Sequence, residues 1–128
     1  MPKKKVLIVD DDREFLEELQ ETLELNGYIP LPVYDSTVAL NTAYTFNPDI
    51  ILLDLKMNDL NGFQVAETIK KIPETSHIPI IAMTGYFTKK EHSMLIKVYG
   101  MEPSLKKPFH PSDLINQIEL VLKNQVSS

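Results

Sequence analysis

The chain of 128 residues contains no cysteine. This absence excludes disulfide bonds, thiolate metal sites and a cysteine nucleophile, and it fits a reducing compartment. No apolar run reaches the roughly 18 to 20 residues that a membrane-spanning helix requires. No secretory signal is visible before the first apolar run. We therefore expect a cytoplasmic location and no membrane segment.

Positive charge is also in short supply. The chain has 13 lysine and arginine residues against 18 aspartate and glutamate residues, for a net charge of -5. This balance argues against a nucleic-acid-binding surface. The one basic cluster, Lys3–Lys5, is expected to be a solvated N-terminus. The length, the 43% hydrophobic content and the lack of repeats or linkers predict one globular domain over residues 1–128.

What the sequence does contain is a regular alternation of short apolar runs and amphipathic segments. The expected strands span residues 6–9, 29–33, 50–53, 78–83 and 104–106, and the expected helices span about 13–25, 36–46, 63–71, 88–99 and 111–124. Two prolines, Pro30 and Pro32, cannot donate ladder hydrogen bonds, so they assign their strand to a sheet edge. Strands that alternate with helices predict a doubly wound parallel α/β sheet with helices on both faces.

Polar residues follow the predicted strands at their carboxyl ends. Asp10 and Asp11 follow the first strand and Asp54 follows the third. Thr84 and Lys107 follow the fourth and the fifth. In doubly wound sheets, ligands bind outside the carboxyl ends of the strands. We therefore expect these side chains to converge on one edge.

The residue types that converge suggest phosphoryl chemistry. Carboxylates as close as Asp10, Asp11 and Asp54 repel one another unless a cation neutralises them, and oxygen ligands suit Mg²⁺. Together with a cation, Lys107 offers positive charge to a phosphoryl group, and Thr84 can donate a hydrogen bond to it. No cysteine or suitably placed histidine is available, so one aspartate would be the nucleophile and form an acyl phosphate.

Each of these residues also has a purely structural explanation. An aspartate after a strand is often a helix N-cap, and we prefer that explanation for Asp12. A cap accounts for at most one of Asp10 and Asp11. Taken alone, Thr84 would be a structural threonine and Lys107 a surface lysine. The functional interpretation depends on their convergence.

The motifs that carry these residues resemble the receiver domains of two-component response regulators, in particular the chemotaxis-regulator-like single-domain type. The matching segments are VLIVDDD at 6–12, PDIILLDLKM at 48–57, NG at 61–62, IIAMTG at 80–85 and KKPF at 106–109. The resemblance runs from Lys5 to about Lys123. It implies the flavodoxin-like receiver fold, a five-stranded parallel sheet with strand order 2-1-3-4-5.

The resemblance implies a role for each acid. Asp54 would receive a phosphoryl group from a partner's phosphohistidine. Asp11 would ligate Mg²⁺ directly, and Asp10 would assist through water. The Asp54 side chain and the backbone carbonyl of Lys56 would complete the protein ligands.

The resemblance also implies how the phosphoryl group is held. Thr84 and Lys107 would bind its oxygens. Gly85 is small and would leave room for the phosphodonor. Pro108 occupies the position of a cis-proline in the family, which would set the direction of the lysine.

The chain departs from the family pattern at two positions. Asn58 replaces a proline in the loop after the phosphoacceptor. Ser104 stands where the family has its switch aromatic, three residues before the lysine. A rotating tyrosine or phenylalanine therefore cannot report phosphorylation at this position.

Lys56 and Tyr86 lie two residues after Asp54 and Thr84, where family members flank the route of attacking water. The pair is similar to that of single-domain receivers in sporulation-type phosphorelays. One hypothesis is that both groups obstruct water and prolong the acyl phosphate; the alternative is that both are ordinary rim residues. Phosphate loss from Lys56→Ala and Tyr86→Ala variants distinguishes the two.

The resemblance implies a signalling function. The domain would accept phosphate from a histidine kinase or histidine phosphotransfer protein and bind a downstream protein according to that state. It would catalyse only its own phosphorylation and dephosphorylation. Two alternatives stay open. One is a degenerate receiver that acts as a phosphorylation-independent binding module. The other is a Mg²⁺-dependent phosphatase, which would usually carry a second acid at the position of Lys56.

Overall fold

The computed structural model describes residues 2–55, 61–85 and 90–126. Its elements are β1 (Lys5–Val9), α1 (Arg13–Leu25), β2 (Ile29–Val33), the 3₁₀ turn η1 (Ser36–Val38), α2 (Ala39–Phe46), β3 (Ile50–Leu55), α3 (Asn61–Lys71), β4 (Ile80–Thr84), α4 (Lys90–Val98), β5 (Glu102–Lys106) and α5 (Pro111–Val126). The strands form one parallel sheet in the order β2-β1-β3-β4-β5, which confirms the predicted fold class and strand order.

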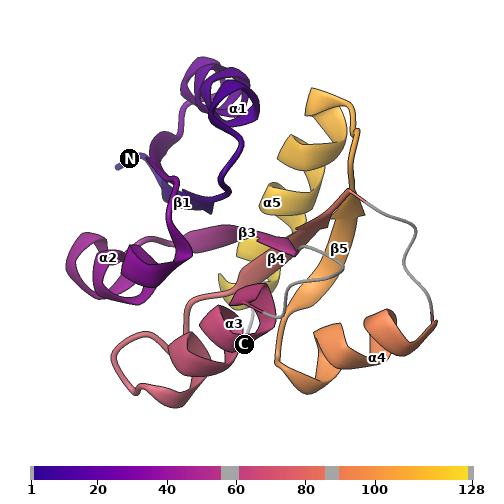
Figure 1. The fold of residues 1–128 in the computed structure, drawn as a ribbon. Helices are drawn as coiled ribbons and strands as arrows, with labels where there is room; N and C mark the ends of the chain where they lie inside the picture. Colours follow the sequence, from indigo (N-terminus) through magenta and orange to yellow (C-terminus); the bar gives the residue numbers. More distant parts are fainter. Residues whose placement is uncertain (1, 56–60, 86–89, 127–128) are drawn as a thin grey trace.

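Helices cover both faces of this sheet (Figure 1). On one face, α1 and α5 pack against residues such as Ile8 and Leu52. On the other face, α2, α3 and α4 pack against the alternate residues of the same strands, among them Leu7 and Leu53. Side chains of a strand alternate between faces, so a strand that is buried on both sides must be apolar throughout. This is why β1, β3 and β4 appear in the sequence as continuous apolar runs.

The two edge strands differ in composition from the inner three. β2 carries Pro30 and Pro32 and lies at one edge, as predicted. β5 lies at the other edge and begins at Glu102, two residues earlier than expected. It contains Pro103, and its register with β4 shifts between the pairs Ile81–Glu102 and Met83–Leu105. An edge strand tolerates both features because only one of its sides is hydrogen-bonded.

Several predicted boundaries change in the structure. β3 continues to Leu55, so Asp54 lies inside the strand and pairs with Met83. β4 begins at Ile80 instead of residue 78, because Pro79 has no N–H and contributes only its carbonyl, which accepts from the Ile51 N–H at 2.9 Å. The predicted helix 36–46 is divided into η1 and α2, and α3 begins at residue 61.

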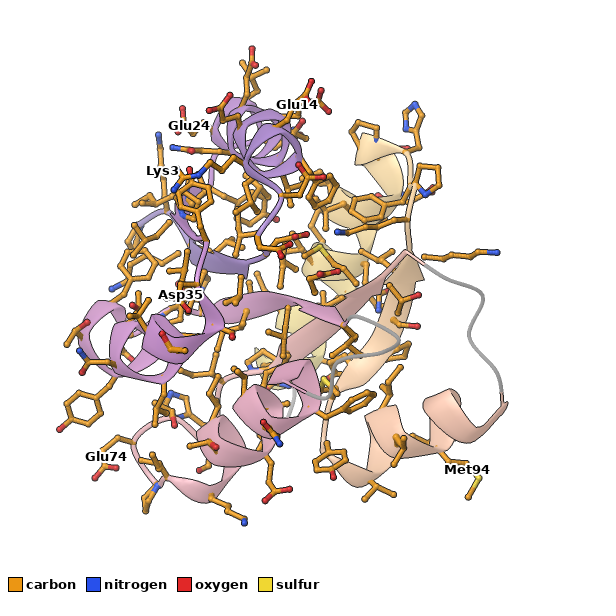
Figure 2. All side chains as sticks on the ribbon, in the orientation of Figure 1. Lys3, Glu14, Glu24, Asp35, Glu74 and Met94 are labelled. Atoms are coloured by element: carbon orange, nitrogen blue, oxygen red, sulfur yellow. The ribbon has the colours of Figure 1, made fainter. Side chains whose placement is uncertain are left out.

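The outer surface of α1 is strongly acidic. The acidic side chains of α1, among them Glu14 and Glu24, project away from the sheet (Figure 2). Gly27 and Gly100 follow α1 and α4 with φ angles of 86° and 74°, a conformation that favours glycine where a helix ends. Among the helices of the described residues, none combines the length and the apolar character needed to cross a membrane.

Candidate functional site

Three consecutive acids follow β1, and each has a different environment. The Asp10 side chain is buried, and its N–H donates to the Val33 carbonyl at 3.1 Å, which extends the β1–β2 ladder. One Asp10 carboxylate oxygen accepts from the Asp12 N–H at 3.1 Å. The Asp12 carboxylate accepts from the Phe15 N–H at 3.1 Å and caps α1, as predicted. Asp11 lies between them and is exposed.

Asp54 brings a third carboxylate to the same edge from the adjacent strand β3. Ligand oxygens of Asp10, Asp11 and Asp54 all lie within 4.8 Å of one another. The Asp54 side chain is 11% exposed, so it is largely but not wholly removed from solvent. Negative charges at this separation repel, and each raises the cost of ionising the others. The cluster therefore requires positive charge nearby.

Lys107 supplies part of that positive charge from the end of β5. Its ammonium nitrogen Nζ lies 2.5 Å from one Asp10 carboxylate oxygen and 3.2 Å from one Asp54 oxygen. The Lys107 N–H donates to the Thr84 carbonyl at 2.5 Å and continues the β4–β5 ladder beyond its last pair. This backbone hydrogen bond holds Lys107 beside the end of β4, from where its side chain extends to the two carboxylates. The Lys107–Pro108 peptide bond is cis, as the resemblance implied.

The surroundings of Lys107 have opposing effects on its charge. Burial lowers the pKa of the ammonium, whereas the hydrogen bond to Asp10 and the negative charges of Asp54 and Asp10 raise it. The raising contributions prevail, so the pKa of Lys107 is above its ordinary value. Lys107 is therefore a permanent cation at neutral pH.

Thr84 is the last residue of β4 and lies between the two strands that deliver Asp54 and Lys107. Its backbone pairs with Leu55 on one side and with Lys106 on the other. It is 3% exposed, in contrast to Gly85, which follows it and is exposed. Among the described residues, no heavy atom lies within 4 Å of the position that a Cβ would occupy on Gly85, apart from its chain neighbours. Gly85 itself therefore adds no side-chain bulk to the rim of the site beside Thr84.

Gly62, in the first turn of α3, packs directly against the end of β3. A Cβ at this position would lie 2.6 Å from a methyl carbon of Leu55 and 2.8 Å from the backbone oxygen of Asp54. Only a residue without a side chain allows α3 to approach Asp54 this closely. The NG motif was noted in the sequence, but this contact was not predicted.

Sequence reasoning also missed an aromatic contact. The Lys107 ammonium lies over the ring of Phe15 in the first turn of α1, 4.1 Å from the ring centroid. The Phe109 ring meets Phe15 edge-on, with centroids 6.0 Å apart. The sequence offered one sign of this contact: Phe15 follows closely after the first acids, and Phe109 follows closely after Lys107.

Ser104 lies on β5, half-buried, at the register shift between β4 and β5. Lys56, Asn58 and Tyr86 lie outside the described residues, so the predictions for the Lys56 carbonyl and for the two modulating side chains stay predictions. The structure thus brings five of the predicted residues to one edge of the sheet, namely Asp10, Asp11, Asp54, Thr84 and Lys107.

Comparisons with known proteins agree with this fold. A CheY-like response regulator receiver domain protein from Methanospirillum hungatei has a structure that superposes with a TM-score of 0.88 at 28% identity, with 98% of each chain covered. The chemotaxis protein CheY4 of Vibrio cholerae superposes with a TM-score of 0.86 at 28% identity and covers 93% of this chain and 98% of its own.

Sequence relatives include a receiver of similar size and a longer protein. The polar-differentiation response regulator DivK of Brucella anthropi is 30% identical over 95% of this chain and 98% of its own length. The probable transcriptional regulator ycf27 of Guillardia theta is 33% identical over 94% of this chain, which spans only 46% of that relative. A family model described as the response regulator receiver domain matches residues 6–119. The chain therefore belongs to the response regulator receiver domain family.

Proposed function

We propose that this domain accepts a phosphoryl group on Asp54 from a histidine kinase or a histidine phosphotransfer protein. The observation that carries the proposal is the ammonium of Lys107 held between Asp10 and Asp54, in a cluster that also contains Asp11. Phosphorylation then changes which downstream protein binds. The proposed location is the cytoplasm, and residues 1–128 are proposed to act as a single receiver domain.

The acidic cluster fits Mg²⁺. Its donors are carboxylate oxygens of Asp10, Asp11 and Asp54, within 4.8 Å of one another, and oxygen is the ligand type that this cation prefers. A divalent cation bound there would add positive charge to a cluster of three carboxylates, next to that of Lys107. We propose these three side chains, with the Lys56 carbonyl, as its protein ligands. When bound, Mg²⁺ supplies positive charge to the oxygens of the transferred group.

The transfer step needs one nucleophile and a balanced exchange of bonds. An Asp54 carboxylate oxygen attacks the phosphorus, a P–O bond forms, and the P–N bond of the phosphohistidine breaks. The bonding electron pair stays on the imidazole nitrogen of the donor. Lys107 keeps its proton and neutralises charge on the phosphoryl oxygens, and the Thr84 hydroxyl donates a hydrogen bond to one of them.

The domain is proposed to catalyse only its own phosphorylation and dephosphorylation. The acyl phosphate ends when water attacks the phosphorus and Asp54 leaves as a carboxylate. Phosphorylation is not reported by an aromatic side chain at the switch position, because Ser104 occupies that position on β5. Phosphorylation is proposed to bias an equilibrium between two arrangements of the segments around Thr84.

The test is incubation with Mg²⁺ and phosphoramidate, followed by intact-mass measurement. We expect a single phosphoryl adduct that depends on Mg²⁺ and is absent from Asp54→Ala. Asp35→Asn is the matched control, because Asp35 also follows a strand but caps η1 and does not belong to the group of Asp10, Asp11 and Asp54. The control is expected to form the adduct normally.

The same experiment separates the alternatives. No adduct on the wild-type protein would contradict the proposal and favour a phosphorylation-independent binding module. Steady release of phosphate from a phosphate monoester would favour a phosphatase instead.

A further inference from the structure

The Lys107 ammonium has an aromatic partner in addition to its two carboxylates. Nζ lies over the face of Phe15, 4.1 Å from the ring centroid, while it contacts Asp10 and Asp54. A cation within about 6 Å of a ring face is attracted by the negative face of the ring. Phe15 therefore attracts the ammonium without adding negative charge to a cluster that already has an excess of it.

Phe15 is held both at its backbone and at its ring. Its backbone N–H donates to the Asp12 cap at 3.1 Å, which anchors the residue in the first turn of α1. The Phe109 ring meets it with an interplanar angle of 81° and a centroid separation of 6.0 Å, an edge-to-face arrangement that aromatic pairs favour. Phe109 lies two residues after Lys107, so the segment that carries the lysine also holds the ring.

Phe15 lies at the margin of the core. It is half-buried and packs against the cluster to which Leu16, Leu19 and Leu23 belong. With Phe109 it lines a shallow groove at the surface between α1 and α5. An aliphatic side chain at this position would lack both the edge-to-face contact with Phe109 and the attraction for a cation.

We propose that Phe15 is a positioning residue, whose ring holds the Lys107 ammonium beside Asp54 where the phosphoryl group arrives. This inference rests on the proposed function. A lysine side chain is a flexible four-carbon stem with a point charge at its end, so it samples many rotamers unless its charge is held. The Phe15 ring narrows that range before the phosphodonor binds.

The first test measures the contact without any phosphorylation. Aromatic ring currents shift protons above a ring face upfield, so the ε-methylene protons of Lys107 are expected upfield of the other lysines in an NMR spectrum of ¹³C-lysine-labelled protein. Loss of the signal in Lys107→Arg assigns it. The upfield shift is expected to disappear in Phe15→Leu. An unshifted Lys107 signal in the wild-type spectrum would overturn the inference while leaving the proposed function intact, whatever shift Lys5 shows over the Phe46 ring.

The second test measures the rate at which phosphoramidate and Mg²⁺ convert the protein to its adduct. We expect Phe15→Leu to react about three- to tenfold more slowly, which corresponds to the loss of a cation–π contact. Phe15→Tyr keeps the ring face and is expected to recover most of the rate. Thr22→Val is the matched control, because Thr22 lines the same groove but lies about two helical turns beyond Phe15 along α1.

A double-mutant cycle decides whether Phe15 acts through the lysine. In a Lys107→Met background, Phe15→Leu is expected to cause no further loss of rate. An equal fold-loss in both backgrounds, or no loss in either, would overturn the inference and leave Phe15 as a packing residue. A wild-type protein that forms no adduct contradicts the proposed function instead, and the NMR measurement then still decides whether the ring holds the lysine.

Discussion

The environment of each aspartate determines what it does. Asp10 and Asp12 are two residues apart, yet Asp10 is 4% exposed and paired with Lys107, whereas Asp12 is exposed and caps a helix. Asp11 contributes to the acidic cluster from its exposed side. Removing the charge of the buried, paired Asp10 should therefore affect stability differently from removing the charge of the exposed Asp11.

Neutralising Asp11 is expected to stabilise the metal-free protein. The substitution Asp11→Asn removes one of three charges that lie within 4.8 Å of one another, so the free energy of unfolding should rise. Coulomb repulsion at this distance and partial exposure is worth about 1 kcal/mol. Urea denaturation with EDTA measures the change. We expect Mg²⁺ to raise the melting temperature of the wild type. This rise should be smaller in Asp11→Asn, because a proposed ligand has been lost.

The neighbouring acid provides the control for this substitution. Asn caps helices as well as Asp does, so Asp12→Asn should leave both the stability and the Mg²⁺ response close to those of the wild type. An undiminished Mg²⁺ response in Asp11→Asn would remove Asp11 from the proposed ligand set.

At the scale of elements, close packing between α3 and β3 positions Asp54. Gly62→Ala would place a methyl group 2.8 Å from the Asp54 backbone oxygen, and a backbone atom cannot move away cheaply. We expect α3 to shift and the free energy of unfolding to fall by about 1 to 3 kcal/mol, as in overpacked cores. Urea denaturation measures the loss. Gly85→Ala is the control, because no heavy atom of the part of the chain that the structure describes lies within 4 Å of its methyl group, apart from chain neighbours. Equal losses in the two variants would contradict the explanation.

The start of η1 depends on a charged cap. One Asp35 oxygen accepts from the Thr37 N–H at 2.9 Å and from its hydroxyl at 2.8 Å. The backbone hydrogen bond and then the hydroxyl hydrogen bond lower the pKa of Asp35 below its ordinary value of 3.8. A carboxyl whose pKa is lowered by folding stabilises the folded state above its unfolded pKa, and this contribution disappears as pH falls through the folded pKa.

The stability advantage of wild type over Asp35→Asn should therefore depend on pH. The advantage should be complete at pH 7 and should decline as pH falls below about 3.8, because the protonated carboxyl and the amide are both neutral. Urea midpoints of the two proteins at a series of pH values measure this difference. An advantage that stays constant down to the acid limit would show that the charge of Asp35 does not contribute.

At the scale of the whole molecule, the central strands carry the stability. Leu52 in β3 is fully buried, so Leu52→Ala should lower the free energy of unfolding by about 2 to 5 kcal/mol. Leu25 at the end of α1 is 80% exposed, and the same substitution there should change stability by less than about 0.5 kcal/mol. Denaturant unfolding of both variants gives the comparison. Comparable losses at the two positions would contradict the assignment of the core.

The fold and most of the site were predictable because they depend on local patterns. Continuous apolar runs identified the inner strands, and proline identified the β2 edge. The contact between Phe15 and Lys107 could not be predicted, because it joins distant segments and depends on side-chain rotamers. The close approach of Gly62 to Asp54 likewise requires the actual distance between α3 and β3. Between the pairs Ile81–Glu102 and Met83–Leu105, β5 has one more residue than β4. This irregularity was not predicted, because it leaves no periodic signal in the sequence.

The prolines of β2 have one more consequence, which follows from the direction of its hydrogen bonds. The Ile29 N–H donates to the Lys4 carbonyl and the Val33 carbonyl accepts from the Asp10 N–H, so these alternate residues face β1. Pro30 and Pro32 therefore occupy the positions that face outward. A second chain approaching this edge finds no N–H donor at either position, and the sheet cannot be extended there into a larger assembly of strands.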